Sequence, residues 1–273
     1  MDPKQELEAA AIAVVGNIEH AKEAPVGVVF RAAELLGEEG RHADRKEVFT
    51  TLRDQRTTEL DREQKFRVDI YFADQKRREP FEDPAAREAN IKEAIRDIDV
   101  SLGRTVGNIG YSHGMTRAEF YQARSQMYRE LGEFNAAVID LSAAVQYANE
   151  HPTLVTPAWK ALHHESLAGT MLDANMLSAN SLDAWKDSIE KLDGDARVRS
   201  EAMLTAVLGN LALRNENLDA AVTSATQSLT FAAGLEEGRY YSGMAVTLLN
   251  AVKERDPGRT GAVDDILKNF GFS

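Results

Sequence analysis

Apolar residues recur at spacings of three and four along nearly the whole chain, as in Ile91, Ile95 and Ile98. This spacing gathers them on one face of a helix, so the sequence predicts a succession of amphipathic helices. Between these helices we expect breaks at glycine and proline residues, which end helices: Pro25, Gly40, 80–84, 103–114, Gly132, 152–157, Gly194, Gly234 and 257–261.

Segment 41–79 contains neither glycine nor proline and is therefore predicted to be helical without a break. Within it, residues 66–72, "FRVDIYF", alternate with a period of two, which is typical of a strand. No partner strand is evident elsewhere in the sequence, so we expect a helix here as well. The predicted fold class is all-α.

An internal repeat is visible in the second half of the chain. When Phe134 is placed on Leu218, residues 132–145, "GEFNAAVIDLSAAV", align with residues 216–229, "ENLDAAVTSATQSL". A fixed repeat length of 20 to 50 residues is typical of stacked helical hairpins. Two pairs of alanines coincide in this alignment: Ala136 and Ala137 with Ala220 and Ala221.

A second match strengthens the repeat, because Gly209 and Gly243 lie 34 residues apart and each precedes apolar residues. Together these positions resemble the tetratricopeptide repeat (TPR) family, whose antiparallel helix pairs place small residues where helices cross. In 118–151 the matching residues are Tyr121, Ser125, Tyr128, Gly132, Phe134, Ala137, Leu141 and Ala144. In 202–235 they are Leu208, Gly209, Leu218, Ala221 and Ser228.

The resemblance covers about residues 116–253 and implies an α-solenoid of antiparallel helix pairs. We expect 116–273 to hold the TPR-like repeats with a C-terminal capping helix. Residues 1–115 are expected to form a helical N-terminal region continuous with the solenoid. Gly132 is expected to allow the tight reversal within its pair.

The chain also departs from the family pattern. Arg124 stands where the family has an aliphatic residue, Ala212 replaces an aromatic one, and Ala225 replaces a large apolar one. The small residues Ser125, Gly169, Gly209 and Gly243 are separated by steps of 44, 40 and 34 residues. Such long steps resemble longer-repeat members of the family such as kinesin light chains. An irregular helical bundle remains the alternative fold, since it too contains alanines at helix contacts.

Cysteine is absent, which excludes disulfides, thiolate nucleophiles and metal sites with cysteine ligands. The apolar run "LEAAAIAVVG" follows the acidic "MDPKQE" instead of the basic lead of a secretory signal. No window of 18 uninterrupted apolar residues is present. We therefore expect a cytoplasmic protein that does not insert into a membrane.

The net charge of −12 disfavours a nucleic-acid partner, because both would be repelled at long range. When the chain is divided into blocks 1–40, 41–80, 81–130 and 131–273, only block 41–80 has a net positive charge, with 11 basic against 9 acidic residues. In this block the segment 65–78, "KFRVDIYFADQKRR", interleaves aromatic and basic residues. It could dock an acidic or nucleic-acid partner, but we favour a charged helix with a buried stripe formed by Phe66, Ile70 and Tyr71.

Few residues suggest catalysis or metal binding. The stretch "HHES" at 163–166 is the only histidine cluster, and adjacent residues on a helix point about 100° apart. The glycine-spaced stretch 103–114, "GRTVGNIGYSHG", is neither a Walker motif nor GxGxxG and is interpreted as a connection. The sequence predicts no metal site, no cofactor and no enzymatic activity.

Site residues follow from the resemblance alone. The first helix of each TPR pair faces the concave groove, and the exposed positions carried onto this chain are Gln122, Gln126, Arg129, Asn210 and Arg214. Gln122 and Gln126 stand where chaperone-binding members have Lys and Asn, so a chaperone tail is not the expected ligand. Instead we expect an acidic patch to meet Arg129 and Arg214.

The function expected from these observations is a non-catalytic scaffold or adaptor that binds a peptide or folded protein partner in the concave groove. A second hypothesis is a regulatory sensor, whose N-terminal helical region binds an effector and whose repeats change shape in response.

Overall fold

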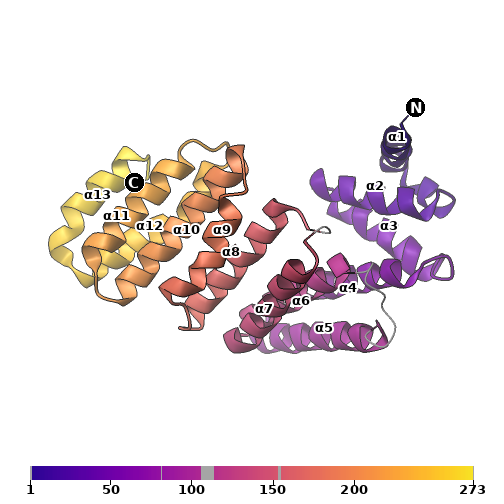
Figure 1. Ribbon diagram of the computed structural model, residues 1–273. Helices are drawn as coiled ribbons and strands as arrows, with labels where there is room; N and C mark the ends of the chain where they lie inside the picture. The colour runs from indigo at the N-terminus through magenta and orange to yellow at the C-terminus, as the bar shows by residue number, and fades with distance from the viewer. Residues whose placement is uncertain (1, 81, 106–113, 153–154, 273) are drawn as a thin grey trace. The chain divides into compact units, whose positions relative to one another are not determined.

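The structure is a computed structural model that describes residues 2–80, 82–105, 114–152 and 155–272, without the side chains of 102–105 and 114–117. Its regular elements in these residues are all helices, thirteen of them α-helices (Figure 1). The all-α prediction is therefore confirmed. The connection expected at 103–114 and the break at 152–157 each include residues outside the described ranges.

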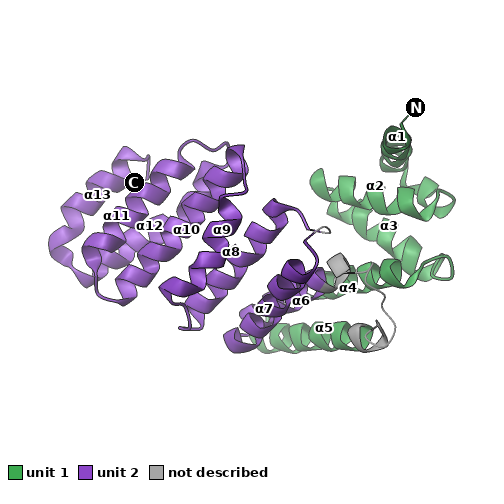
Figure 2. Ribbon diagram, in the orientation of Figure 1, with its two compact units in different colours: residues 1–116 green, residues 117–273 purple. Residues whose placement is uncertain are grey.

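The chain divides into two compact units, unit 1 with residues 1–116 and unit 2 with residues 117–273 (Figure 2). This boundary lies one residue after the one that we placed between 115 and 116. Each unit is described by itself below.

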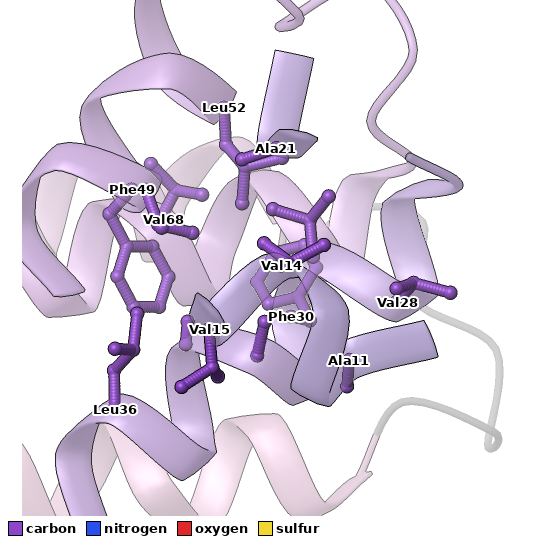
Figure 3. Packing of buried hydrophobic residues seen from close by; sticks show 14 of the residues in the cluster. Ala11, Val14, Val15, Ala21, Val28, Phe30, Leu36, Phe49, Leu52 and Val68 are labelled. Carbon is purple, nitrogen blue, oxygen red and sulfur yellow. The ribbon is translucent and has the colours of Figure 1, made fainter. Parts of the chain in front are cut away.

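Unit 1 contains five α-helices and a short 3-10 helix, Ile18–Lys22. Its apolar core gathers side chains from the first four α-helices (Figure 3), with the ring of Phe49 stacked on that of Tyr71 at a centroid distance of 4.0 Å. The α-helices are α1 (Pro3–Gly16), α2 (Val26–Glu38), α3 (His42–Asp54), α4 (Arg62–Arg78) and α5 (Pro84–Thr105).

The prediction of an unbroken helix over 41–79 is wrong, because α3 ends at Asp54 and α4 begins at Arg62. A capping box starts α4: the Asp61 carboxylate accepts from the Gln64 N–H at 2.8 Å, and the Gln64 side chain accepts from the Asp61 N–H at 3.0 Å. Residues 66–72 lie within α4, so the prediction of a helix for this alternating stretch is confirmed.

Arg56, 6% exposed, holds the connection between α3 and α4 in place. Its guanidinium donates to the carbonyl oxygens of Ala21 and Ala24, both at 2.7 Å, and to the carboxylate of Glu59. A buried cation is stable only when its donors are satisfied. These bonds therefore fix the connection against the end of the 3-10 helix.

Unit 2 contains eight α-helices in four successive pairs, with α8 packed against α7, α9 and α10, and α10 packed against α11 and α12. We call α6, α8, α10 and α12 the first helices of these pairs. The α-helices are α6 (Gly114–Glu130), α7 (Phe134–Glu150), α8 (Pro157–Asp173), α9 (Asp183–Ile189), α10 (Gly194–Arg214), α11 (Leu218–Ala232), α12 (Gly238–Arg255) and α13 (Thr260–Asn269). Short 3-10 helices lie at Ala179–Leu182 and Pro257–Arg259.

Three first helices end in the same kind of reversal. The second residue after each helix end has a left-handed backbone, with φ of 73° at Gly132, 60° at Asn175 and 60° at Glu216. The next N–H then bonds back to a carbonyl five residues earlier, as from Glu133 to Tyr128 at 2.8 Å. The reversal expected at Gly132 is confirmed, whereas the break after Asp173 was not foreseen.

Gly209 lies at a close helix crossing. A Cβ added there would be 2.4 Å from Leu248 Cδ2, 3.1 Å from the Ser224 Cβ and 3.3 Å from the Ala221 carbonyl oxygen. Only glycine fits between α10, α11 and α12 without a shift of its neighbours. A Cβ on Gly243 would meet nothing within 4 Å, so the 34-residue match of these two glycines does not mark equivalent crossings.

The α6–α7 pair is joined by a buried ion pair. The Arg124 guanidinium donates to both carboxylate oxygens of Asp140, at 2.7 and 2.6 Å, and the Asp140 side chain is only 3% exposed. The rings of three aromatic residues on α6 lie within 6 Å of the guanidinium carbon. Arg124 thus replaces the aliphatic contact of the TPR pattern with a charged one.

Candidate functional site

The five residues predicted to bind a partner lie on two first helices of unit 2. Gln122, Gln126 and Arg129 are on α6, and Asn210 and Arg214 are on α10. Asn210 donates to the Ala206 carbonyl of its own helix at 2.9 Å. The structure brings the two arginines to the same end of α8 but does not gather all five side chains around one point.

Both arginines bond to the end of α8. Arg129 donates to Asp173 at 3.3 Å, with each side chain 41% exposed, and Arg214 donates to the side chain of Asn175. The second terminal nitrogen of Arg214 is buried and has no hydrogen-bond partner. A ligand at these arginines would therefore have to displace contacts inside unit 2. The contact that is easiest to displace is the exposed ion pair of Arg129 with Asp173.

A different surface crosses three first helices, and we call it the three-helix face: Glu165 on α8, Arg199 and Met203 on α10, and Tyr241 and Met244 on α12. Each of the five side chains is half-buried. Arg199 and Met203 are four residues apart and Tyr241 and Met244 three apart, so each pair lies on one side of its helix. α10 packs against both α8 and α12, and the contact of Arg199 with Tyr241 shows that these sides of α10 and α12 adjoin.

Contacts between helices hold the three-helix face together. Arg199 Nη1 donates to the Tyr241 hydroxyl at 3.5 Å, and the guanidinium carbon lies 5.8 Å from the centre of that ring. Met203 and Met244 pack on a buried cluster that includes Trp185. The arrangement combines a cation and a phenol with adaptable thioether side chains, which conform to varied apolar surfaces.

Burial changes the charge of this region. Burial raises the pKa of the Glu165 carboxyl to about 7, against the opposing field of the Arg199 cation. Burial, with smaller contributions from the charges of Lys160 and His163, lowers the pKa of His164 to about 4. At neutral pH, His164 is therefore neutral and Glu165 is near the midpoint of its titration.

The histidines of the "HHES" stretch are packed inside unit 2. His163 is 0% exposed, bonds through Nδ1 to the Trp159 carbonyl oxygen at 2.9 Å, and stacks on the Trp159 ring. Across the described residues, no three His, Asp or Glu side chains are grouped so that they could hold a metal ion. In this stretch the half-buried Glu165 belongs to the three-helix face, and the sequence alone does not single it out.

Segment 65–78 forms most of α4 and has the buried stripe that we favoured. Phe66 and Tyr71 are 5% and 7% exposed, while Ile70 is half-buried. Four of its five basic residues bond to carboxylates: Arg67 to Glu63, Arg77 and Arg78 to Asp74, and Lys76 to Glu93 and Asp97. These pairs neutralise the positive charge on which a nucleic-acid partner would depend.

A hollow of about 590 Å³ lies in unit 1 between α3, α4 and α5. Phe72 forms part of its wall beneath the guanidinium of Arg53, whose central carbon is 3.8 Å from the ring centre. Val100, 53% exposed, also lines it, as do Ser101 and Asp69, which are joined by a hydrogen bond of 2.7 Å. The sequence alone does not indicate this hollow, because it depends on how three helices pack.

None of the helices in the described ranges is long and apolar enough to span a bilayer. A scan against protein-family models finds no match for this chain, and neither does a search of curated proteins. The TPR resemblance therefore stays a prediction from the sequence.

Proposed function

We propose that the chain is a non-catalytic interaction protein whose unit 2 is a TPR-like α-solenoid that holds a peptide or a folded partner. The observation that carries the proposal is the repeated construction of unit 2. The first helices α6, α8 and α10 end in the same left-handed reversal, and α8, α10 and α12 pack in succession. In solenoids this succession places the first helices along one continuous binding face.

The three-helix face is the part of unit 2 that we assign to the partner. It offers two half-exposed methionines, which fill irregular apolar contacts, and an arginine next to a tyrosine. Aromatic and arginine side chains supply much of the binding energy in protein interfaces. Tyr240, 79% exposed, extends the aromatic surface at the same end of α12.

Selection of ligands from a random 12-residue peptide library displayed on phage, with the full chain as the target, tests this function. We expect peptides to be enriched, and Met203→Asp or Met244→Asp to weaken their binding at least tenfold, because a charge would replace apolar contact. The matched control is Ile139→Asp on α7, where the side chain is 69% exposed. Circular dichroism establishes that each variant is folded.

A library without enriched peptides would contradict peptide binding by this chain. Binding that survives both methionine changes but is lost with Ile139→Asp would move the site to the second helices.

The hollow in unit 1 supports a second candidate function, the effector-responsive sensor. Its volume of about 590 Å³ lies within the range of small-molecule sites. Val100→Trp would narrow it, so a metabolite library screened by thermal shift should yield ligands that stabilise the wild-type chain more than the variant. Ligands that stabilise both proteins equally would remove this hollow as the effector site.

A further inference from the structure

We infer that Arg199 and Tyr241 together bind a carboxylate side chain of the partner peptide, while an adjacent apolar side chain of that peptide packs on Met203 and Met244. This inference rests on the proposed function and specifies the chemistry of the ligand.

The first support is the unusual situation of Arg199. Its guanidinium is half-buried, yet no carboxylate of the described residues lies within ion-pair distance of it. Its neighbour Arg197, by contrast, bonds to Glu201 at 2.9 Å. A guanidinium has five N–H donors, and the bond to Tyr241 at 3.5 Å is long for a hydrogen bond. Arg199 therefore retains donors for a planar anion such as a carboxylate.

Tyr241 completes the anion site. Its hydroxyl lies beside Arg199 and can donate a hydrogen bond to an incoming carboxylate oxygen. An acidic side chain at this point would instead repel the carboxylate. The methionines one turn away on α10 and α12 lie on the same sides of these helices. The surface thus fits an acidic residue flanked by an apolar one.

Glu165 adds a dependence on pH. Its carboxyl lies in the field of the Arg199 cation on α10, and the adjacent His164 on α8 is neutral at pH 7. When Glu165 is protonated, the site is net positive and attracts a carboxylate. When Glu165 is ionised, it offsets Arg199 and repels the ligand. Binding should therefore take up a proton and weaken as pH rises through about 7.

Peptides selected from the phage library provide the probe, and each is compared with the same peptide in which Asp or Glu is replaced by Asn or Gln. We expect the enriched peptides to carry an acidic residue. Both its replacement and Arg199→Gln should reduce affinity about tenfold or more. The matched control Arg197→Gln should bind as the wild type does. Tyr241→Phe, which removes only the hydroxyl, should lose about two- to tenfold.

The second arm measures affinity between pH 6 and pH 8, where the peptide carboxylate stays ionised. Wild-type affinity should fall about three- to tenfold across this range, and Glu165→Gln should make it constant. Enriched peptides that bind Arg199→Gln as tightly as the wild type would overturn the inference and leave the proposed function standing. Failure to enrich any peptide would contradict peptide binding by this chain, and the inference would fall with it.

Discussion

The α6–α7 and α10–α11 hairpins have the same plan but different contacts between their helices. In both, the first helix ends in a left-handed residue, and the second helix begins four residues after the first one ends. Ala137 and Ala221, which coincide in the alignment, are both 0% exposed. The first hairpin then adds a buried ion pair, Arg124 with Asp140, whereas the second brings its helices together at Gly209.

This difference shows what the repeat requires. The alignment that places Phe134 on Leu218 also places Arg124 on Leu208 and Asp140 on Ser224. A buried alanine is therefore shared, while the charged pair of the first hairpin is replaced in the second by Leu208 and Ser224, which carry no charge. Buried ion pairs are costly to desolvate, so the charged contact depends on keeping both partners. The two hairpins should respond differently to substitution.

The largest effect is expected for Arg124→Leu, which puts the residue of the second hairpin into the first. It removes two hydrogen bonds from a carboxylate that is 3% exposed, so the free energy of unfolding should fall by about 3 to 5 kcal/mol. Urea unfolding followed by circular dichroism measures the loss.

The matched variant carries Arg124→Leu with Asp140→Ser, the pair found in the second hairpin. It leaves no buried charge at this contact and should recover most of the lost stability. A double variant as unstable as Arg124→Leu would show that the two hairpins are not interchangeable at this contact.

A smaller effect separates Gly209 from Gly243. A methyl group at Gly209 would meet the buried Leu248, Ser224 and the Ala221 carbonyl, so Gly209→Ala should cost about 1 to 3 kcal/mol. At Gly243 a methyl group meets nothing within 4 Å, and alanine favours the helix, so Gly243→Ala should stabilise by about 1 kcal/mol. Equal losses of thermal stability in the two variants would restore the equivalence suggested by their spacing.

Much of the fold could be predicted because the helices and the turn at Gly132 are determined by residues that are close in the sequence. The break between α3 and α4 was missed because it contains no glycine or proline, although Asp61 and Gln64 form a capping pair that the sequence displays. The reversals at Asn175 and Glu216 were harder to foresee, since neither residue requires a left-handed backbone. A glycine in a helix likewise does not reveal whether another helix touches it.

The candidate site could be predicted far less well. The TPR resemblance placed Arg129 and Arg214 on first helices, but it could not show that both bond to the end of α8. The role of Arg199 depends on which residue of α12 lies opposite it, and the pKa of Glu165 depends on how deeply α8 is packed. Both properties arise from tertiary packing.

The smallest expected effect concerns the reversal that the hairpins share. Glu216 adopts φ of 60°, a conformation that strains any residue with a Cβ, whereas the first hairpin has glycine there. Glu216→Gly should therefore raise the free energy of unfolding by about 0.5 to 1 kcal/mol, and Gly132→Ala should lower it by about 1 kcal/mol. Urea unfolding of the three proteins side by side measures both changes.

Glu216→Ala is the control: it removes the carboxylate but keeps the Cβ, so it should stay within about 0.5 kcal/mol of the wild type. If Glu216→Ala stabilised the chain as much as Glu216→Gly, the gain would come from loss of the carboxylate, and the two reversals would differ in more than the strain of one backbone angle.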